Sequence, residues 1–182
     1  MSKPHTLVVL VEDQPGVLNR VVSLLRRRSF NIDSITVGHS EQPGVSRMTI
    51  VVIGEDNDVE QAGKQLYKIM EVLKVTDVTD QNVIEHEMAL VKVAAKPQHR
   101  AEILLIAQIY DAKVIDASPS TLLLEATGSE DRIDALLAMV RPFGIRELVR
   151  TGRIAMTRGS STVAGKQHGR GEQVGNGVVA AD

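Results

Sequence analysis

Residues 5–36 carry a strand pattern, a turn and a helix pattern in direct succession, and this order restricts the fold more than any other stretch. The apolar run at 7–11 predicts a buried strand. Apolar residues then recur at the i, i+3, i+4 and i+7 spacing of one helix face, and a second strand is predicted from Asn31. The helix face consists of Leu18, Val21, Val22 and Leu25.

Pro15 and Gly16 separate the first strand from the helix. Proline suits the first turn of a helix, where its missing N–H costs nothing. Glycine lets another molecule approach the backbone closely. The free N–H groups and partial positive charge of a helix start suit a small anion such as a carboxylate. The same two residues also suit an ordinary strand-to-helix turn, so this pattern alone does not establish a binding site.

The remaining elements complete the same unit and then repeat it. In the first half, strands are predicted at 32–37, 46–53 and 72–78, and a helix at 59–70 with the apolar stripe Ala62, Leu66, Ile69 and Leu73. In the second half, strands are predicted at 87–95, 112–117 and 121–127, with one or two more in 145–157. The second-half helices are predicted at 97–110, striped by Ala101, Leu104, Leu105 and Gln108, and from the Ser129 cap to 140, striped by Ile133, Leu136, Leu137 and Val140.

Strand, helix, strand, strand, helix, strand is the order of the split βαβ unit, which places two helices on one face of four antiparallel strands. The sequence therefore predicts an α+β fold with two ferredoxin-like (βαββαβ) domains at 5–79 and 80–159, joined near residues 80–82. From 160 to 182, glycine, serine and polar residues dominate without periodicity. This tail is predicted to be disordered.

Composition excludes several classes of function. The 182 residues include no cysteine, which rules out disulfides, thiolate metal sites and cysteine nucleophiles. A net charge of −2 does not favour nucleic acid or anionic membranes. RNA modules of this topology stack bases on aromatic residues of the central strands, and 7–11 and 46–53 carry none. Without a signal peptide or membrane span, we expect a cytoplasmic protein.

No catalytic constellation is visible. The motifs GxSxG, HExxH and GxxxxGK[ST] do not occur. Five scattered histidines, His5, His39, His86, His99 and His168, are expected at the surface rather than as ligands or bases. We therefore predict no catalytic residue and no metal site, and a chain that is not itself an enzyme.

The strand at 32–37 is predicted at an edge of the first sheet, with Asp33 as its only charge and no proline. An edge without such protection can pair with a second copy of the chain. Two domains side by side would form a continuous eight-stranded sheet. The turn before the first helix of one copy would then face the edge strand of the other.

Several blocks of sequence, in this order, resemble the ACT-domain regulatory (small) subunits of acetolactate synthase, also called acetohydroxyacid synthase. They are LVEDQPGVLNRVVSLLRRRSFNIDSITVG, SRMTIVV, QLYKIMEVLKV, MALVKV, IDASPS and FGIRELVRTGRIAMTRG. The resemblance covers residues 5–159 and identifies 5–79 as an ACT regulatory domain.

The resemblance implies a non-catalytic subunit in the biosynthesis of the branched-chain amino acids valine and isoleucine. Such a subunit forms a homodimer through its ACT domains, activates the large subunit and confers feedback inhibition by valine. Thiamine diphosphate, Mg and FAD are then expected on the large subunit, and no cofactor in this chain. By matched position, the effector would be surrounded by Asp13, Gly16, Val17, Leu18, Asn31 and Ile32.

One of these positions departs from the family pattern, because some members have asparagine where this chain has Asp13. A carboxylate there can pair with the ammonium group of an amino acid but repels its carboxylate. Two other readings stay open. One is a stand-alone ACT-type amino-acid sensor with another partner. The other is catalysis by this chain itself. Two observations count against it: the thiamine-binding GDG…NN pattern is missing, and the chain is short.

Overall fold

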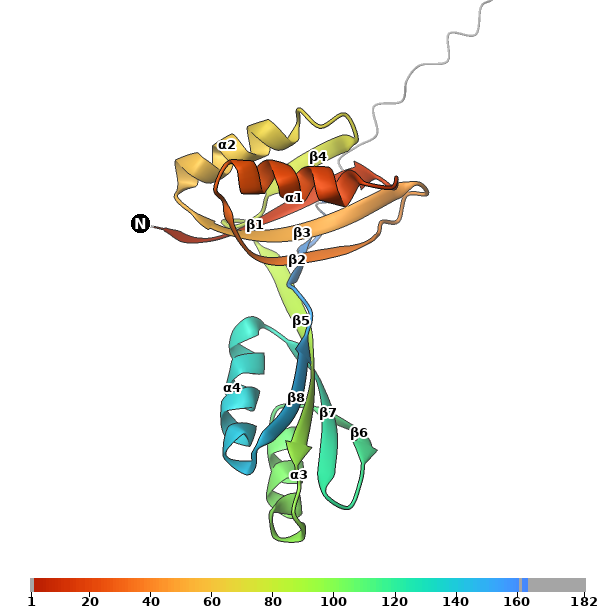
Figure 1. Ribbon diagram of the computed structural model, residues 1–182, viewed down its shortest axis with the longest axis vertical. Helices are drawn as coiled ribbons and strands as arrows, with labels where there is room; N and C mark the ends of the chain where they lie inside the picture. The colour runs from red at the N-terminus through yellow and green to blue at the C-terminus, as the bar shows by residue number, and fades with distance from the viewer. Residues whose placement is uncertain (1, 161, 164–182) are drawn as a thin grey trace, which may run out of the picture.

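The computed structural model describes residues 2–160, 162 and 163, which form two units of sheet and helices (Figure 1). The first sheet has the order β2-β3-β1-β4 with antiparallel neighbours, and both helices cover one of its faces. This confirms the ferredoxin-like α+β prediction for this unit. Its elements are β1 (Lys3–Glu12), α1 (Val17–Arg27), β2 (Asn31–His39), β3 (Val45–Gly54), α2 (Asp56–Leu66) and β4 (Val72–Asp77).

The first core lies between the two central strands and the helices. Every second residue of β1 and β3 points into it, as the period of two in a strand requires. The predicted face of α1 contributes Val21 and Leu25. The predicted stripe of α2 was wrong at Leu73, which is half exposed in β4, because the helix begins at Asp56 and ends at Leu66. The main core residues are Leu7, Val9, Val11, Val17, Val21, Leu25, Met48, Ile50, Val52, Val59, Ala62 and Leu66.

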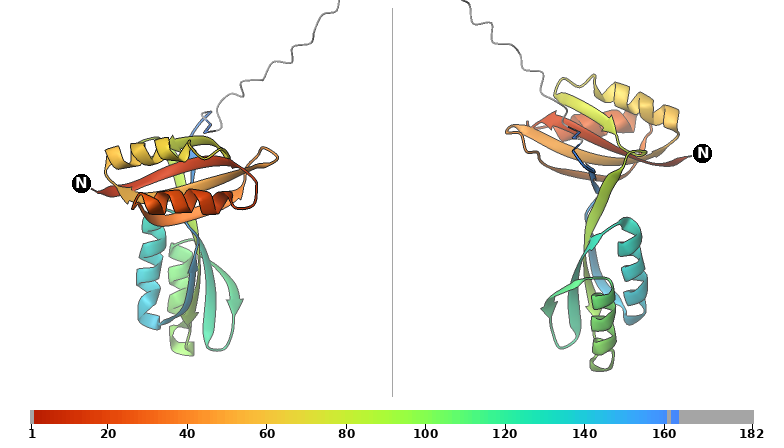
Figure 2. Two further views of the ribbon diagram at one scale, coloured as in Figure 1. Left: turned by 45° about the horizontal axis from the view of Figure 1, so that its top comes forward. Right: turned by 180° about the vertical axis from the view of Figure 1, so that it is seen from behind.

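The second unit repeats the topology, with the strand order β6-β7-β5-β8 and two helices on one face (Figure 2). The predicted stripe of α4 is confirmed, since all four of its residues are buried. The stripe of α3 was wrong: Ile103, Ile106 and Ala107 are buried, whereas Leu105 is more than half exposed. The elements are β5 (Val83–Ala94), α3 (Arg100–Ile109), β6 (Lys113–Ala117), β7 (Thr121–Gly128), α4 (Glu130–Val140), β8 (Ile145–Arg150) and β9 (Ile154–Thr157), with 3-10 turns at Pro97–His99 and Arg141–Phe143.

Strand β5 belongs to both units. Residues 83–86 pair with β9 beneath the first sheet, and residues 87–94 pair with β7 and β8 in the second sheet. Val8 on the uncovered face of the first sheet packs there with Val78, Ala155 and Val163. Packing therefore extends to Val163, and the rest of the predicted disordered tail lies outside the described residues.

Two arginines near β9 form ion pairs, and one of them, Arg153, connects the two units. Arg153 donates from Nη1 to Glu85 Oε2 at 3.0 Å and to Thr6 Oγ1 at 3.4 Å, and from Nη2 to Glu130 on α4. Arg150 donates to both carboxylate oxygens of Glu87, at 2.6 and 2.7 Å, and these bonds raise the pKa of Arg150. The Arg153 bonds connect β1, β5 and α4, and so fix the second unit against the first.

Gly152, in the turn between β8 and β9, lies against the edge strand β2. A Cβ added there would be 2.6 Å from Thr36 Oγ1 and 3.1 Å from the carbonyl oxygen of Ile35. We expect Gly152→Ala to lower the free energy of unfolding by about 1–3 kcal/mol, the usual cost of overpacking. Urea unfolding measures this. Gly38→Ala is the matched control, because a Cβ at Gly38 meets nothing within 4 Å; equal stability of the two variants would contradict the packing.

Candidate functional site

The turn between β1 and α1 is built around Gly16. This residue is the N-cap of α1 and has a φ of 87°, in the left-handed region that glycine occupies without strain. The sequence had suggested that Pro15 lies in the first turn of the helix. The helix begins at Val17, so Pro15 lies before it. A glycine N-cap has no side chain to bond the first N–H groups of the helix.

Backbone N–H groups are free at this helix start. The first helical hydrogen bond runs from Arg20 N to Gly16 O at 3.1 Å, and Val17 N bonds to Gln14 O at 3.4 Å. Within the described chain, the N–H groups of Gly16, Leu18 and Asn19 have no acceptor. These groups, with the positive end of the helix dipole, can bind a carboxylate.

Asp13 is held at the mouth of the turn by contacts from the hairpin between β2 and β3. Its N–H donates to Gly44 O at 2.8 Å, and its Oδ1 accepts a hydrogen bond from Ser46 Oγ at 3.1 Å. Its Oδ2 lies 3.3 Å from His39 Nδ1. His39 and Ser46 were not among the residues predicted for the site. The pairing of β1 with β3, which sets Ser46 opposite Val11, is the signal that could have found them.

The apolar residues predicted for the site differ in how much of each residue is exposed to solvent. Val17 is 2% exposed and belongs to the core, and Ile32 also packs against the core. Leu18 is 43% exposed, beside the free N–H groups. In one chain, Leu18 is therefore the predicted residue best placed to give apolar surface to a ligand.

The six predicted residues form two groups at opposite ends of the sheet. Asp13 and the helix start lie at the end where β2 finishes, beside His39. Asn31 begins β2 at the other end, where it pairs with Ile53. Asn31 and His39 are eight positions apart in the strand, which at about 3.3 Å per residue is roughly 25 Å. One chain does not bring the two groups together.

The outer edge of β2 is available for pairing. Strand β2 is the edge of its sheet, as predicted, and in the described chain its backbone pairs only with β3. A bulge between Ile32 and Ser34 interrupts that ladder at Asp33. The sequence did not indicate this irregularity, which twists a strand locally. Residues 34–39 pair regularly and present a continuous edge.

Among the described residues, no three histidine, aspartate or glutamate side chains gather closely enough to hold a metal ion. His5 was expected at the surface and this was wrong, because the side chain is only 2% exposed. It lies between two carboxylates, with Nε2 3.4 Å from Asp56 Oδ1 and Nδ1 3.5 Å from Asp77 Oδ2. His168 lies outside the described residues. No helix in the described part of the chain is long and apolar enough to span a bilayer.

Comparison with similar proteins establishes the family to which the chain belongs. The chain is 49% identical over 156 residues to the probable acetolactate synthase small subunit of Archaeoglobus fulgidus, covering 86% of this chain and 98% of that protein. It is 46% identical over 165 residues to the acetolactate synthase small subunit of Bacillus subtilis, covering 90% and 95%. The chain belongs to the family of acetolactate synthase small subunits.

Both halves of this small subunit carry family features. Residues 7–74 match the family described as the AHAS small subunit-like ACT domain, and residues 86–159 match the small subunit of acetolactate synthase. The crystal structure of the Thermotoga maritima small subunit superposes with a TM-score of 0.81 at 40% identity, covering 87% of this chain and 99% of that one. The small-subunit resemblance predicted from the sequence is therefore confirmed.

The backbone at Gly16 gives a test of the turn. Any other residue at φ 87° is strained, so we expect Gly16→Ala to lower the free energy of unfolding by about 1–2 kcal/mol. Gly63→Ala is the control and should act in the opposite direction. Gly63 lies inside α2, where alanine is favoured by about 0.5–1 kcal/mol, and its added Cβ meets only an ordinary contact with Val75. Urea unfolding of both variants measures the difference, and the same sign for both would contradict the assigned backbone.

Proposed function

We propose that this small subunit is a valine sensor that regulates the acetolactate synthase large subunit, and that its effector site is shared by two copies. The observation that carries the proposal is the position of the predicted residues. Asp13 and Asn31 lie at opposite ends of an edge strand whose outer side has no partner in the described chain. Antiparallel pairing of that edge with a second copy would bring them together.

The register of such a dimer follows from strand geometry. Antiparallel pairing of β2 with itself about Ile35 sets Asn31 of one copy opposite His39 of the other, because both are four residues from the centre. His39 is already beside Asp13 in its own chain. A two-fold axis produces two identical sites in this way. Each site combines the helix start of one copy with the first residues of β2 from the other.

The chemistry of this composite site suits a small apolar amino acid. The carboxylate would accept hydrogen bonds from the free N–H groups at Gly16, Leu18 and Asn19, each contributing about 1.5–3 kcal/mol. The ammonium would bind the carboxylate of Asp13 and the side-chain oxygen of Asn31. The isopropyl group would lie on Leu18, contributing at most about 1.5–3 kcal/mol. One methylene is worth only about 1–3 kcal/mol, so selectivity for valine over leucine or isoleucine is expected to be partial.

The regulatory role follows from the shared site. A ligand that contacts both copies favours the arrangement of the dimer that closes the site, and it thereby shifts the population of conformations. The large subunit, with its thiamine diphosphate, Mg and FAD, would sense this change in the cytoplasm. Reconstitution of the two subunits with a valine titration tests the role. We expect activation by the small subunit and inhibition by valine, whereas a stand-alone sensor would neither bind nor activate the large subunit.

A mixing experiment tests whether two copies share the site. Asp13→Ala and Asn31→Ala proteins should each bind valine at least tenfold more weakly than the natural protein, as expected for the loss of a charge-assisted hydrogen bond. After the two variants are unfolded and refolded together, half of the dimers are mixed and each mixed dimer contains one intact site. Calorimetry should therefore recover about a quarter of the natural sites at natural affinity.

Asn57→Ala is the matched control, since Asn57 is an exposed residue of α2 and is not one of the residues assigned to the site. It should bind valine with unchanged affinity. If mixing restores no site although both single variants fold and have lost binding, each chain holds a complete site of its own. In that case the shared site would be wrong.

A further inference from the structure

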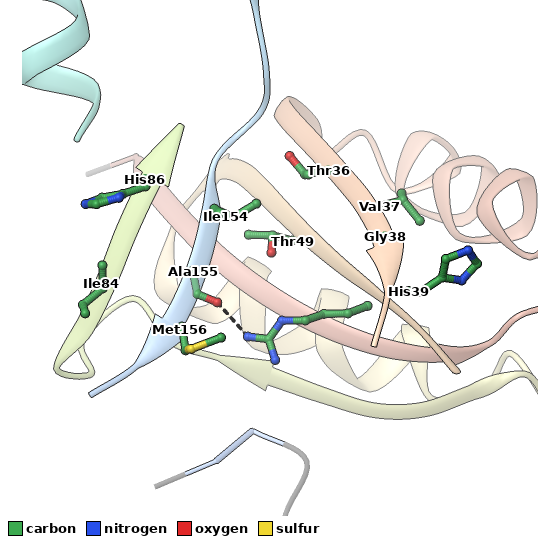
Figure 3. Close-up of a pocket in the computed structure, with 11 residues that line it drawn as sticks. Thr36, Val37, Gly38, His39, Thr49, Ile84, His86, Ile154, Ala155 and Met156 are labelled. Carbon is green, nitrogen blue, oxygen red and sulfur yellow. Dashed lines mark hydrogen bonds between the residues drawn. The ribbon is translucent and has the colours of Figure 1, made fainter. Parts of the chain in front are cut away.

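A second cavity lies between the two units, away from the helix start. It is bounded by the face of the first sheet opposite the helices and by the ladder of β5 with β9, and its volume is about 410 Å³ (Figure 3). Cavities of a few hundred Å³ that are mostly apolar are typical of small-molecule sites. Most of its wall is apolar, with Val37 from β2, Ile84 from β5, and Ile154, Ala155 and Met156 from β9.

Arg47 is the one lysine, arginine, aspartate or glutamate side chain in the wall of this cavity. It belongs to β3, is partly buried, and donates from Nη2 to the carbonyl oxygen of Ala155 at 2.7 Å. Within the described residues no carboxylate forms an ion pair with it. Burial lowers the pKa of Arg47, against a smaller opposite effect of Glu41. A partly desolvated cation without a counter-ion favours the binding of an anion.

The other polar groups of the wall also suit an anion. Thr49 brings a hydroxyl group to the wall, whereas the Thr36 hydroxyl oxygen is buried beside Gly152. His39 and His86 also line the cavity, but their imidazole rings point away from it (Figure 3). No aspartate or glutamate lines the cavity, so its wall offers no carboxylate to an ammonium group. The wall therefore fits an aliphatic acid better than an amino acid.

We propose that this cavity binds a small aliphatic carboxylate without an α-ammonium group. The ligand's carboxylate lies on the guanidinium of Arg47, and its hydrocarbon part packs on Ile84, Ile154 and Met156. Simple branched fatty acids and branched 2-oxo acids share this chemistry. The valine site proposed above differs in having a carboxylate, Asp13, to receive an ammonium group.

The two sites are neighbours in the chain. His39 lines the cavity and also lies 3.3 Å from Asp13 Oδ2. A ligand on Arg47 and a ligand at the helix start would therefore lie on opposite faces of the same sheet, near its β2 edge. Every residue of the cavity wall comes from one chain, although residues 36–39 belong to the edge strand that the proposed dimer pairs.

Calorimetric titration of the full chain tests the proposal with 3-methylbutanoate, 3-methyl-2-oxobutanoate and valine as probes. We expect saturable binding of one or both acids. Arg47→Met should weaken that binding about tenfold or more, because a charge-assisted bidentate contact is lost. Arg146→Met is the matched control, since Arg146 is exposed on β8 away from the cavity, and should bind the acids unchanged. The two acids compared with each other distinguish a fatty acid from a 2-oxo acid as the preferred ligand.

A second variant keeps the test valid if Arg47→Met does not fold. Ile84→Glu places a carboxylate in the wall at a side chain that is 41% exposed, where it can pair with Arg47 and exclude the acids. It should abolish acid binding while thermal unfolding stays cooperative. The proposal is overturned if neither acid binds, which is the result expected if a second copy fills the cavity. It is also overturned if the Ile84→Glu variant still binds the acids. If the natural chain binds the acids but does not bind valine, only the proposed dimer site is contradicted.

Discussion

The pairing of β5 with two different sets of strands is the constraint on which the rest of the molecule depends. Its first four residues form a ladder with β9 under the first sheet, and the remainder is the central strand of the second sheet. Because one continuous strand serves both units, neither can rotate freely about the connection. Arg153 reinforces this arrangement through Thr6, Glu85 and Glu130, and the cavity lined by Arg47 exists only because the ladder lies against the first sheet.

Local patterns predicted most of the elements and failed where local information is ambiguous. The stripe of α4 was correct, and that of α1 was correct for Val21 and Leu25 but wrong for Leu18, which is 43% exposed. In α3, apolar residues occupy both sides, so periodicity could not choose Ile103 over Leu105 as the buried one. The ladder of β5 with β9 joins residues about seventy positions apart, as in the pair Glu85 and Ala155, and such pairing leaves no periodic signal in the sequence. His5 is buried because it lies on the central strand β1. The sequence around a single histidine does not indicate such a position.

The sequence predicted the residues of the candidate effector site and a turn that faces the edge strand of a second copy, but not the contacts of these residues within one chain. The glycine at the helix start was recognised, although its role also includes a left-handed backbone that the sequence did not specify. The partners of Asp13 come from the far end of a hairpin, and their identification needs the register of β1 with β3. Val17 was matched by position, yet its side chain is directed into the core. A position in a motif therefore indicates proximity of the backbone more reliably than the direction of a side chain.

The contact of Gly152 with Ile35 and Thr36 has a consequence for symmetry. These residues are at the middle of β2, where the two-fold axis of the proposed dimer would pass. The turns carrying Gly152 in the two copies would then both lie close to that axis, each attached to its own second unit. A movement at the axis would reach both second units at once, so the dimer would change state in a concerted rather than a sequential manner.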